Sequence, residues 1–82
     1  MVEIEFMKEF KIVFYNIKDN LLKKRVIKQI EKIRNNPKVG KPMRNVRKGI
    51  RELRIKPFRL SYIHFSDKDL IYILDLYHKK GQ

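Results

Sequence analysis

The sequence is a chain of 82 residues with 21 basic residues, nine acidic residues, a formal net charge of +12 and no cysteine. At this length we expect one domain spanning residues 1–82, and the lack of thiols excludes disulfides and cysteine-ligated metal sites. Charged residues near the N-terminus exclude a signal peptide, and no uncharged run approaches the ~20 residues of a membrane span. The composition therefore predicts a soluble, cytoplasmic protein.

The first part of the chain predicts a strand and two helices. Residues 2–6 alternate between apolar and acidic side chains, which is typical of a half-buried strand at or near a sheet edge. Apolar residues spaced by three and four over residues 6–17 predict a short helix. Asp19 and Asn20 can cap a second helix, which the residues from Asn35 to Pro37 end. Its buried stripe is predicted to be Leu22, Val26, Ile30 and Ile33, widened by Leu21 and Ile27.

The second half predicts a basic loop and three antiparallel strands. The loop at residues 38–49 contains two glycines and a proline, and the first two strands meet at Lys56 and Pro57. After a turn at residues 66–69, the nearly apolar run at 70–76 is expected to be the central strand, covered on both faces. The predicted fold is α+β, with an N-terminal strand, a two-helix hairpin on one side of a small sheet, and a three-stranded antiparallel meander.

The positive charge is concentrated in the middle of the chain. Residues 38–59 contain nine basic residues and one acid, whereas residues 1–18 and 60–82 are each neutral overall. Such a concentrated field favours a nucleic acid, or an acidic protein that competes for the same surface. The alternative interpretation is a basic face that is only solvated.

The clearest candidate site lies on the first two strands of the meander. Alternate residues of a strand share a face, so Glu52 and Arg54 lie on a mostly charged face. Arg59 follows the turn and is predicted to return close to Arg54. Cations fixed on a sheet surface suggest binding of phosphate.

Other kinds of chemistry find no support in the sequence. The nine acids are too dispersed for a two-metal site, and His64 and His78 lie fourteen residues apart without a nearby cluster of acidic ligands. There is no glycine-rich phosphate loop and no serine or cysteine nucleophile with an evident base, so we expect no metal and no cofactor. The cations are compatible with metal-free RNA cleavage, in which the substrate's 2′-hydroxyl attacks the adjacent phosphate and the protein stabilises charge and moves protons.

The second half of the chain resembles a known family. It reads Arg-Glu-Leu-Arg-Ile from Arg51, Phe-Arg-Leu-Ser-Tyr from Phe58, an Asp-rich turn, and an apolar strand that ends in Tyr-His-Lys-Lys. With the paired helices before it, this order resembles the RelE/ParE toxin superfamily, and most of all archaeal RelE-type toxins. The resemblance implies a toxin of a type II toxin–antitoxin system: an endoribonuclease that needs the ribosome, cuts mRNA in the A site, and is silenced by an acidic RelB-like antitoxin.

The resemblance also implies roles for individual residues. The catalytic residues it implies are Arg54, Arg59, His78 and Lys79. The two arginines would act on the scissile phosphate, and His78 or Lys79 would move a proton. The RNA-binding or ribosome-binding residues are expected to be Arg44, Arg47, Lys48, Arg51, Lys56 and Tyr77. Glu52 departs from the pattern, because bacterial RelE has a catalytic lysine at that place.

Two other functions stay open at this point. One is a ParE-like toxin that inhibits DNA gyrase by contact alone, and the other is a simple RNA-binding module. The set of cations together with Tyr77 and His78 favours the nuclease, because an inhibitor that acts by contact has no chemical reason to keep these residues together.

Overall fold

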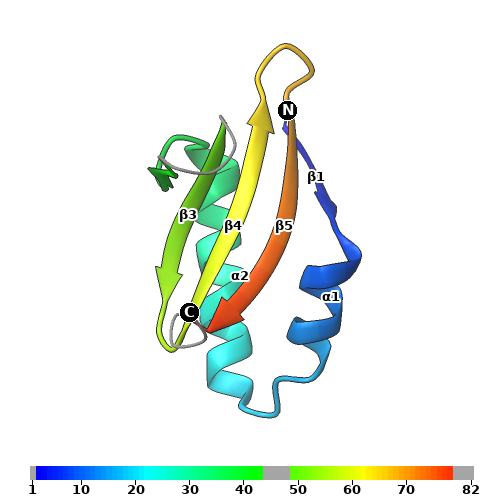
Figure 1. Ribbon diagram of the computed structural model, residues 1–82, viewed down its shortest axis with the longest axis vertical. Helices are drawn as coiled ribbons and strands as arrows, with labels where there is room; N and C mark the ends of the chain where they lie inside the picture. Colours follow the sequence, from blue (N-terminus) through cyan, green and yellow to red (C-terminus); the bar gives the residue numbers. More distant parts are fainter. Residues whose placement is uncertain (1, 44–48, 79–82) are drawn as a thin grey trace.

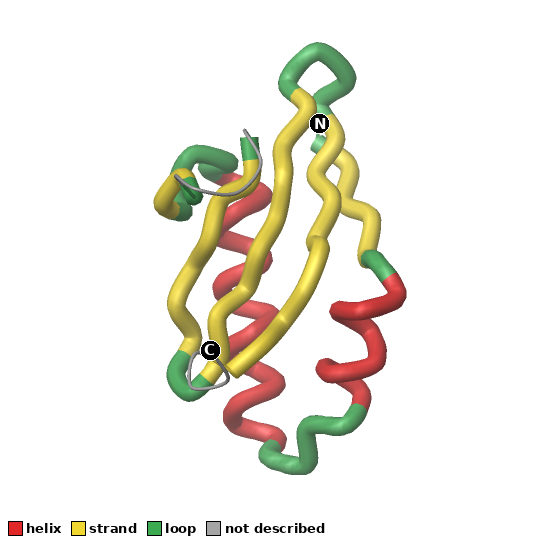
Figure 2. Tube along the Cα trace, viewed as in Figure 1, coloured by secondary structure: helices red, strands yellow, loops and turns green. Residues whose placement is uncertain are grey.

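The computed structural model describes residues 2–43 and 49–78 as one five-stranded sheet with two helices on one of its faces (Figure 1, Figure 2). The elements are β1 (Glu3–Phe6), α1 (Lys8–Tyr15), α2 (Asn20–Asn35), β2 (Lys41–Pro42), β3 (Ile50–Ile55), β4 (Phe58–Phe65) and β5 (Leu70–His78). The strand order is β1-β5-β4-β3-β2, with β1 parallel to β5 and the other pairs antiparallel. The α+β prediction is confirmed, with β2 as an additional short strand.

The N-terminal segment agrees with the predicted order but changes from strand to helix later than its periodicity suggests. β1 is an edge strand, and Phe6 is its last residue rather than the first residue of a helix. The ring of Phe6 stacks on Phe10 at a centroid distance of 5.4 Å, and Phe10 stacks on Phe14 at 5.5 Å. Phe6, Phe10 and Phe14, which are four residues apart, therefore form one continuous stack of rings that begins in the strand.

Helix α2 begins and ends where the sequence predicts. The Asp19 carboxylate accepts hydrogen bonds from the backbone N–H groups of Leu21 and Leu22, so it satisfies two donors that the first turn leaves free. The helix ends at Asn35, before Pro37. Neither helix in the described part of the chain is long and apolar enough to cross a membrane.

The buried side of α2 is narrower than predicted. Val26, Ile30 and Ile33 are buried against the sheet, as the stripe predicts. Leu21 and Ile27 do not widen it, because their side chains are 72% and 50% exposed. Ile27 lines a groove beside α1 and Leu21 is exposed to solvent, so that part of the prediction is wrong.

The middle of the sheet is β4 rather than β5. The fully buried side chains of these two strands face the helices, and they are Leu60, Tyr62, Ile71, Ile73 and Leu76. The opposite face of β5 is only half-buried, because both helices pack on the same side (Figure 2). The expectation that residues 70–76 are covered on both faces is therefore wrong, and the other face of the sheet is open.

A β-bulge in β5 decides which residues reach that open face. Ser61 is paired with Asp75 and Tyr62 is paired with Ile73, so Leu74 is an extra residue on β5. The bulge reverses the alternation of side chains, because Ile73 and Leu76 are both buried under the helices. As a result, Tyr77 faces the open side of the sheet.

Tyr62 fastens the segment after α2 to the sheet. Its hydroxyl donates to the carbonyl of Pro37 at 2.8 Å and accepts from the N–H of Gly40 at 2.9 Å. A Cβ on Gly40 would lie 2.8 Å from this hydroxyl oxygen and 2.9 Å from the carbonyl oxygen of Glu52, so a larger residue does not fit there. Burial raises the pKa of Tyr62. This contact fixes where β2 meets β3.

Replacing Tyr62 by phenylalanine is expected to lower the free energy of unfolding by about 1–3 kcal/mol, because the buried N–H of Gly40 loses its acceptor. Urea denaturation followed by circular dichroism measures the change. Tyr15→Phe is the matched control, since the Tyr15 side chain is 69% exposed. It should alter stability by less than ~0.5 kcal/mol, and equal losses in the two variants would contradict the anchoring role.

Candidate functional site

Three neighbouring strands place polar side chains together on the open face of the sheet. Glu52 comes from β3, Arg59 from β4 and Tyr77 from β5. Oε1 of Glu52 accepts a hydrogen bond from Nη1 of Arg59 at 2.6 Å, and Oε2 accepts one from the Tyr77 hydroxyl at 2.5 Å. We call these three residues the Glu52 cluster. Of the predicted site residues, the structure thus brings Arg59 and Tyr77 together around Glu52.

The register of β3 and β4 explains why an acid is needed there. Arg54 lies directly opposite Arg59, and like charges in that arrangement destabilise a sheet. Glu52 is the diagonal neighbour of Arg59 and offsets this repulsion. The side chains of Glu52 and Arg59 are each 19% exposed, so their ion pair is partly desolvated and stronger than a pair in open solvent. Arg54 stays exposed.

Arg59 keeps hydrogen-bonding capacity that the described residues do not use. Its Nε is buried and has no partner among them. A buried donor without an acceptor is costly, and an acceptor from a ligand would remove that cost. A shallow cleft beside the Glu52 cluster is lined by Val39, Gly40, Lys41, Glu52, Leu53, Arg54 and Arg59. Three cations and one carboxylate in such a cleft can hold a phosphodiester and accept a proton.

His78 lies away from this cluster. It faces the helices, where its ring packs on Phe58 with a centroid distance of 4.5 Å and lines a surface with Ile17 and Pro57. The bulge at Leu74 is the reason, because regular alternation after Ile73 would place His78 on the open face. The structure thus does not bring His78 together with Arg59.

The other predicted residues are distributed over several places. The Arg51 guanidinium donates to the carbonyls of Gly40 at 2.7 Å and Lys38 at 3.3 Å, so it braces the loop before β2. Lys56 is exposed in the turn after β3, on a surface that it shares with Arg54 and Arg59. The predicted residues Arg44, Arg47, Lys48 and Lys79 lie outside the described residues.

Sequence reasoning missed Glu52 as a member of the site. Its signal was present, because Glu52 is the only acid among residues 38–59 and shares a strand face with Arg54. Tyr77 was expected to contact RNA or the ribosome, and in the structure its hydroxyl donates to the Glu52 carboxylate. Among the described residues, no group of three or more histidines and acids is arranged to hold a metal ion.

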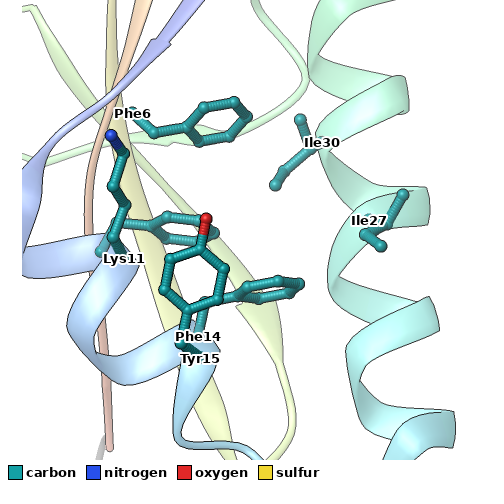
Figure 3. Close-up of a pocket in the computed structure, with 7 residues that line it drawn as sticks. Phe6, Lys11, Phe14, Tyr15, Ile27 and Ile30 are labelled. Carbon is teal, nitrogen blue, oxygen red and sulfur yellow. The ribbon is translucent and has the colours of Figure 1, made fainter.

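A second surface feature lies on the helix side of the sheet. Figure 3 shows a groove between α1 and α2, in which the rings of α1 face Ile27 and Ile30 of α2. The groove is lined by Phe6, Phe10, Lys11, Phe14, Tyr15, Ile27 and Ile30. We call it the helix groove. Tyr15 and Ile27 are at least half exposed, so the groove presents clustered apolar side chains to solvent.

Comparison with known proteins gives a family match and a set of similar structures. The family model described as the ParE toxin of the type II toxin–antitoxin system parDE matches residues 4–82. No curated protein matches the sequence.

Several solved toxins have the same fold. The toxin in the Escherichia coli RelBE complex has a TM-score of 0.82 at 11% identity, covering 98% of this chain and 99% of that chain. The archaeal RelE–RelB complex from Pyrococcus horikoshii OT3 has a TM-score of 0.76 at 11% identity, covering 99% and 98%. A metal-bound toxin from Helicobacter pylori has a TM-score of 0.73 at 25% identity, covering 96% of each chain.

The titration of Tyr77 tests the geometry of the Glu52 cluster. Burial and the hydrogen bond to Glu52 raise the pKa of Tyr77 from 10.0 to about 12. The bond therefore contributes to stability below pH 10 and is lost as the pH rises through about 12. Alkaline titration of tyrosinate absorbance should show that Tyr77→Phe lacks the step near pH 12. Loss of a step near pH 10 instead would contradict the contact.

Proposed function

The chain belongs to the ParE toxin family of type II toxin–antitoxin systems, within the RelE/ParE superfamily, and we propose that it is a ribosome-dependent endoribonuclease that cuts mRNA in the ribosomal A site. The observation that carries this proposal is the Glu52 cluster. It combines a carboxylate that can take a proton with a guanidinium that can hold a phosphate, and Arg54 lies next to both. The protein would act in the cytoplasm, where ribosomes and mRNA are found.

The proposed reaction is an attack by the substrate's own 2′-hydroxyl. Its oxygen bonds to the adjacent phosphorus while Glu52 takes the hydroxyl proton. The bond between phosphorus and the 5′-oxygen breaks, which leaves a 2′,3′-cyclic phosphate and a 5′-hydroxyl. Arg59 and Arg54 stabilise the negative charge that develops on the non-bridging oxygens.

The 5′-oxygen needs a proton as it leaves. The sequence offered His78 or Lys79 for this step, and His78 faces the helices. We therefore assign the proton donation to Lys79, two residues after Tyr77 in the chain, since a protonated lysine can act as a general acid. Lys41 and Lys56, with the predicted Arg44, Arg47 and Lys48, would attract the RNA backbone in a salt-dependent way.

The ion pair in the free protein supports the need for a ribosome. Nη1 of Arg59 is held by Glu52 at 2.6 Å, so an RNA phosphate must compete with this carboxylate. A shallow cleft on an 82-residue protein offers few contacts to offset that competition. An mRNA that the ribosome holds in place is presented to Arg59 at a high effective concentration. Its phosphate can then replace Glu52 as the partner of Arg59.

Inhibition of DNA gyrase by contact is the second candidate function. It is favoured by the family model, which is that of ParE. In this alternative the Glu52 cluster only braces the sheet, and Arg54 would contact a protein or DNA without chemistry.

Programmed ribosomes incubated with the purified toxin provide the test of the nuclease. The wild type should cut mRNA in register with codons, and Arg59→Ala or Glu52→Gln should lower the cleavage rate by ~10²–10⁴-fold. Glu52→Gln should still bind ribosomes at least as tightly, because Arg59 loses the partner that neutralises it. Glu5→Gln is the matched control, since Glu5 is an exposed acid on the edge strand β1.

The contrary result would be an absence of cuts by the wild type while it still arrests cell growth. Inhibition of gyrase supercoiling by the same preparation would then support the second candidate function.

We also propose that an acidic RelB-like antitoxin fills the helix groove. Two proteins of the same fold were solved as complexes of RelE with RelB, and this chain carries a net charge of +12. An amphipathic helix would bury its apolar side against Phe14 and Ile27. Its acidic residues would meet Lys11 in the groove and Lys23, whose Nζ lies 5.5 Å from the centre of the Phe14 ring.

An aspartate at Ile27 tests this partner surface, because it places a charge where the apolar contact is expected. Ile27→Asp should weaken binding of the co-expressed acidic antitoxin by at least ~tenfold in isothermal titration, about 1.4 kcal/mol. Leu21→Asp is the matched control, since Leu21 is an exposed residue of the same helix outside the groove. If both substitutions weaken antitoxin binding equally, or if neither weakens it, the antitoxin binds elsewhere.

A further inference from the structure

The Tyr77 side chain reaches across a whole strand to meet its partner. Tyr77 lies on β5 and Glu52 on β3, with β4 between them. The residue paired with Tyr77 on β4 is Arg59, so the phenol extends past the arginine to the carboxylate. Tyr77 and Arg59 therefore hold the two oxygens of one carboxylate from different strands.

We propose that Tyr77 is a positioning residue, which holds the Glu52 carboxylate in place when Arg59 turns to the substrate phosphate. The inference rests on the nuclease function proposed above. The terminal torsion of a glutamate is broad, so a carboxylate bound only by the arginine would follow the guanidinium as it moves. With Oε2 held by the phenol at 2.5 Å, Oε1 is the oxygen that Arg59 leaves and that takes the proton of the 2′-hydroxyl.

The phenol is suited to this role because it stays a donor. Burial and the neighbouring carboxylate raise the pKa of Tyr77 to about 12, so its hydroxyl keeps its proton throughout the neutral range. It therefore does not compete with Glu52 for the substrate proton. Tyr77 acts only through Glu52 and touches no reacting atom in this proposal.

The test is Tyr77→Phe in single-turnover cleavage of mRNA on programmed ribosomes. The rate at saturating toxin should fall by ~10–100-fold, the size expected when a catalytic group loses its support. The toxin concentration for half-maximal rate should stay unchanged, because RNA contacts are kept. Tyr72→Phe is the matched control, since Tyr72 lies on the same face of β5 and its ring packs edge-on against Phe65.

A double substitution separates positioning from a purely structural role. Because Tyr77 acts through Glu52, adding Tyr77→Phe to Glu52→Gln should cause no further loss of rate. Losses that multiply, or a Tyr77→Phe variant that cuts as fast as wild type, would overturn the positioning role while the nuclease stands. A variant that changes only the half-maximal concentration would make Tyr77 an RNA contact and overturn it too. A wild type that does not cut would overturn the proposed function itself.

Discussion

A single carboxylate organises the open face of this sheet. Arg54 and Arg59 lie opposite each other on β3 and β4, and this pairing is unfavourable unless an acid lies nearby. Glu52 supplies the acid and also binds Tyr77 on β5, so it joins three strands through one side chain. The acid that offsets this repulsion also brings three groups close together: its own carboxylate, the Arg59 guanidinium and the Tyr77 hydroxyl.

Much of the fold could be predicted because its signals are local. Asp19 caps α2 as predicted, and alternation or spacing by three and four predicted the order of strands and helices. The bulge at Leu74 could not be predicted, because residues 70–76 are nearly all apolar. Before Asp75 they show no alternation of polar and apolar residues that would reveal which side chains face the helices. That single extra residue exchanges the faces of Tyr77 and His78, so the sequence could not show that Tyr77 rather than His78 lies beside Arg59.

The two candidate surfaces lie on opposite sides of the sheet. Both helices lie on one side of the sheet (Figure 1). The helix groove lies between them, and the Glu52 cluster lies on the opposite face of the sheet. An antitoxin helix in the groove would leave the cluster open to solvent. The proposed antitoxin helix would therefore leave Arg54 and Arg59 uncovered.

We propose that the Glu52 cluster promotes attack by the 2′-hydroxyl of the substrate. The most direct measurement uses ribosomes programmed with mRNA that carries a single 2′-deoxynucleotide on the 5′ side of the scissile phosphate. The wild-type toxin should cut the all-ribose mRNA to a 2′,3′-cyclic phosphate and leave the deoxy-substituted mRNA intact at that site. Cleavage of the substituted mRNA at the same bond, or no cleavage of either mRNA, would contradict it.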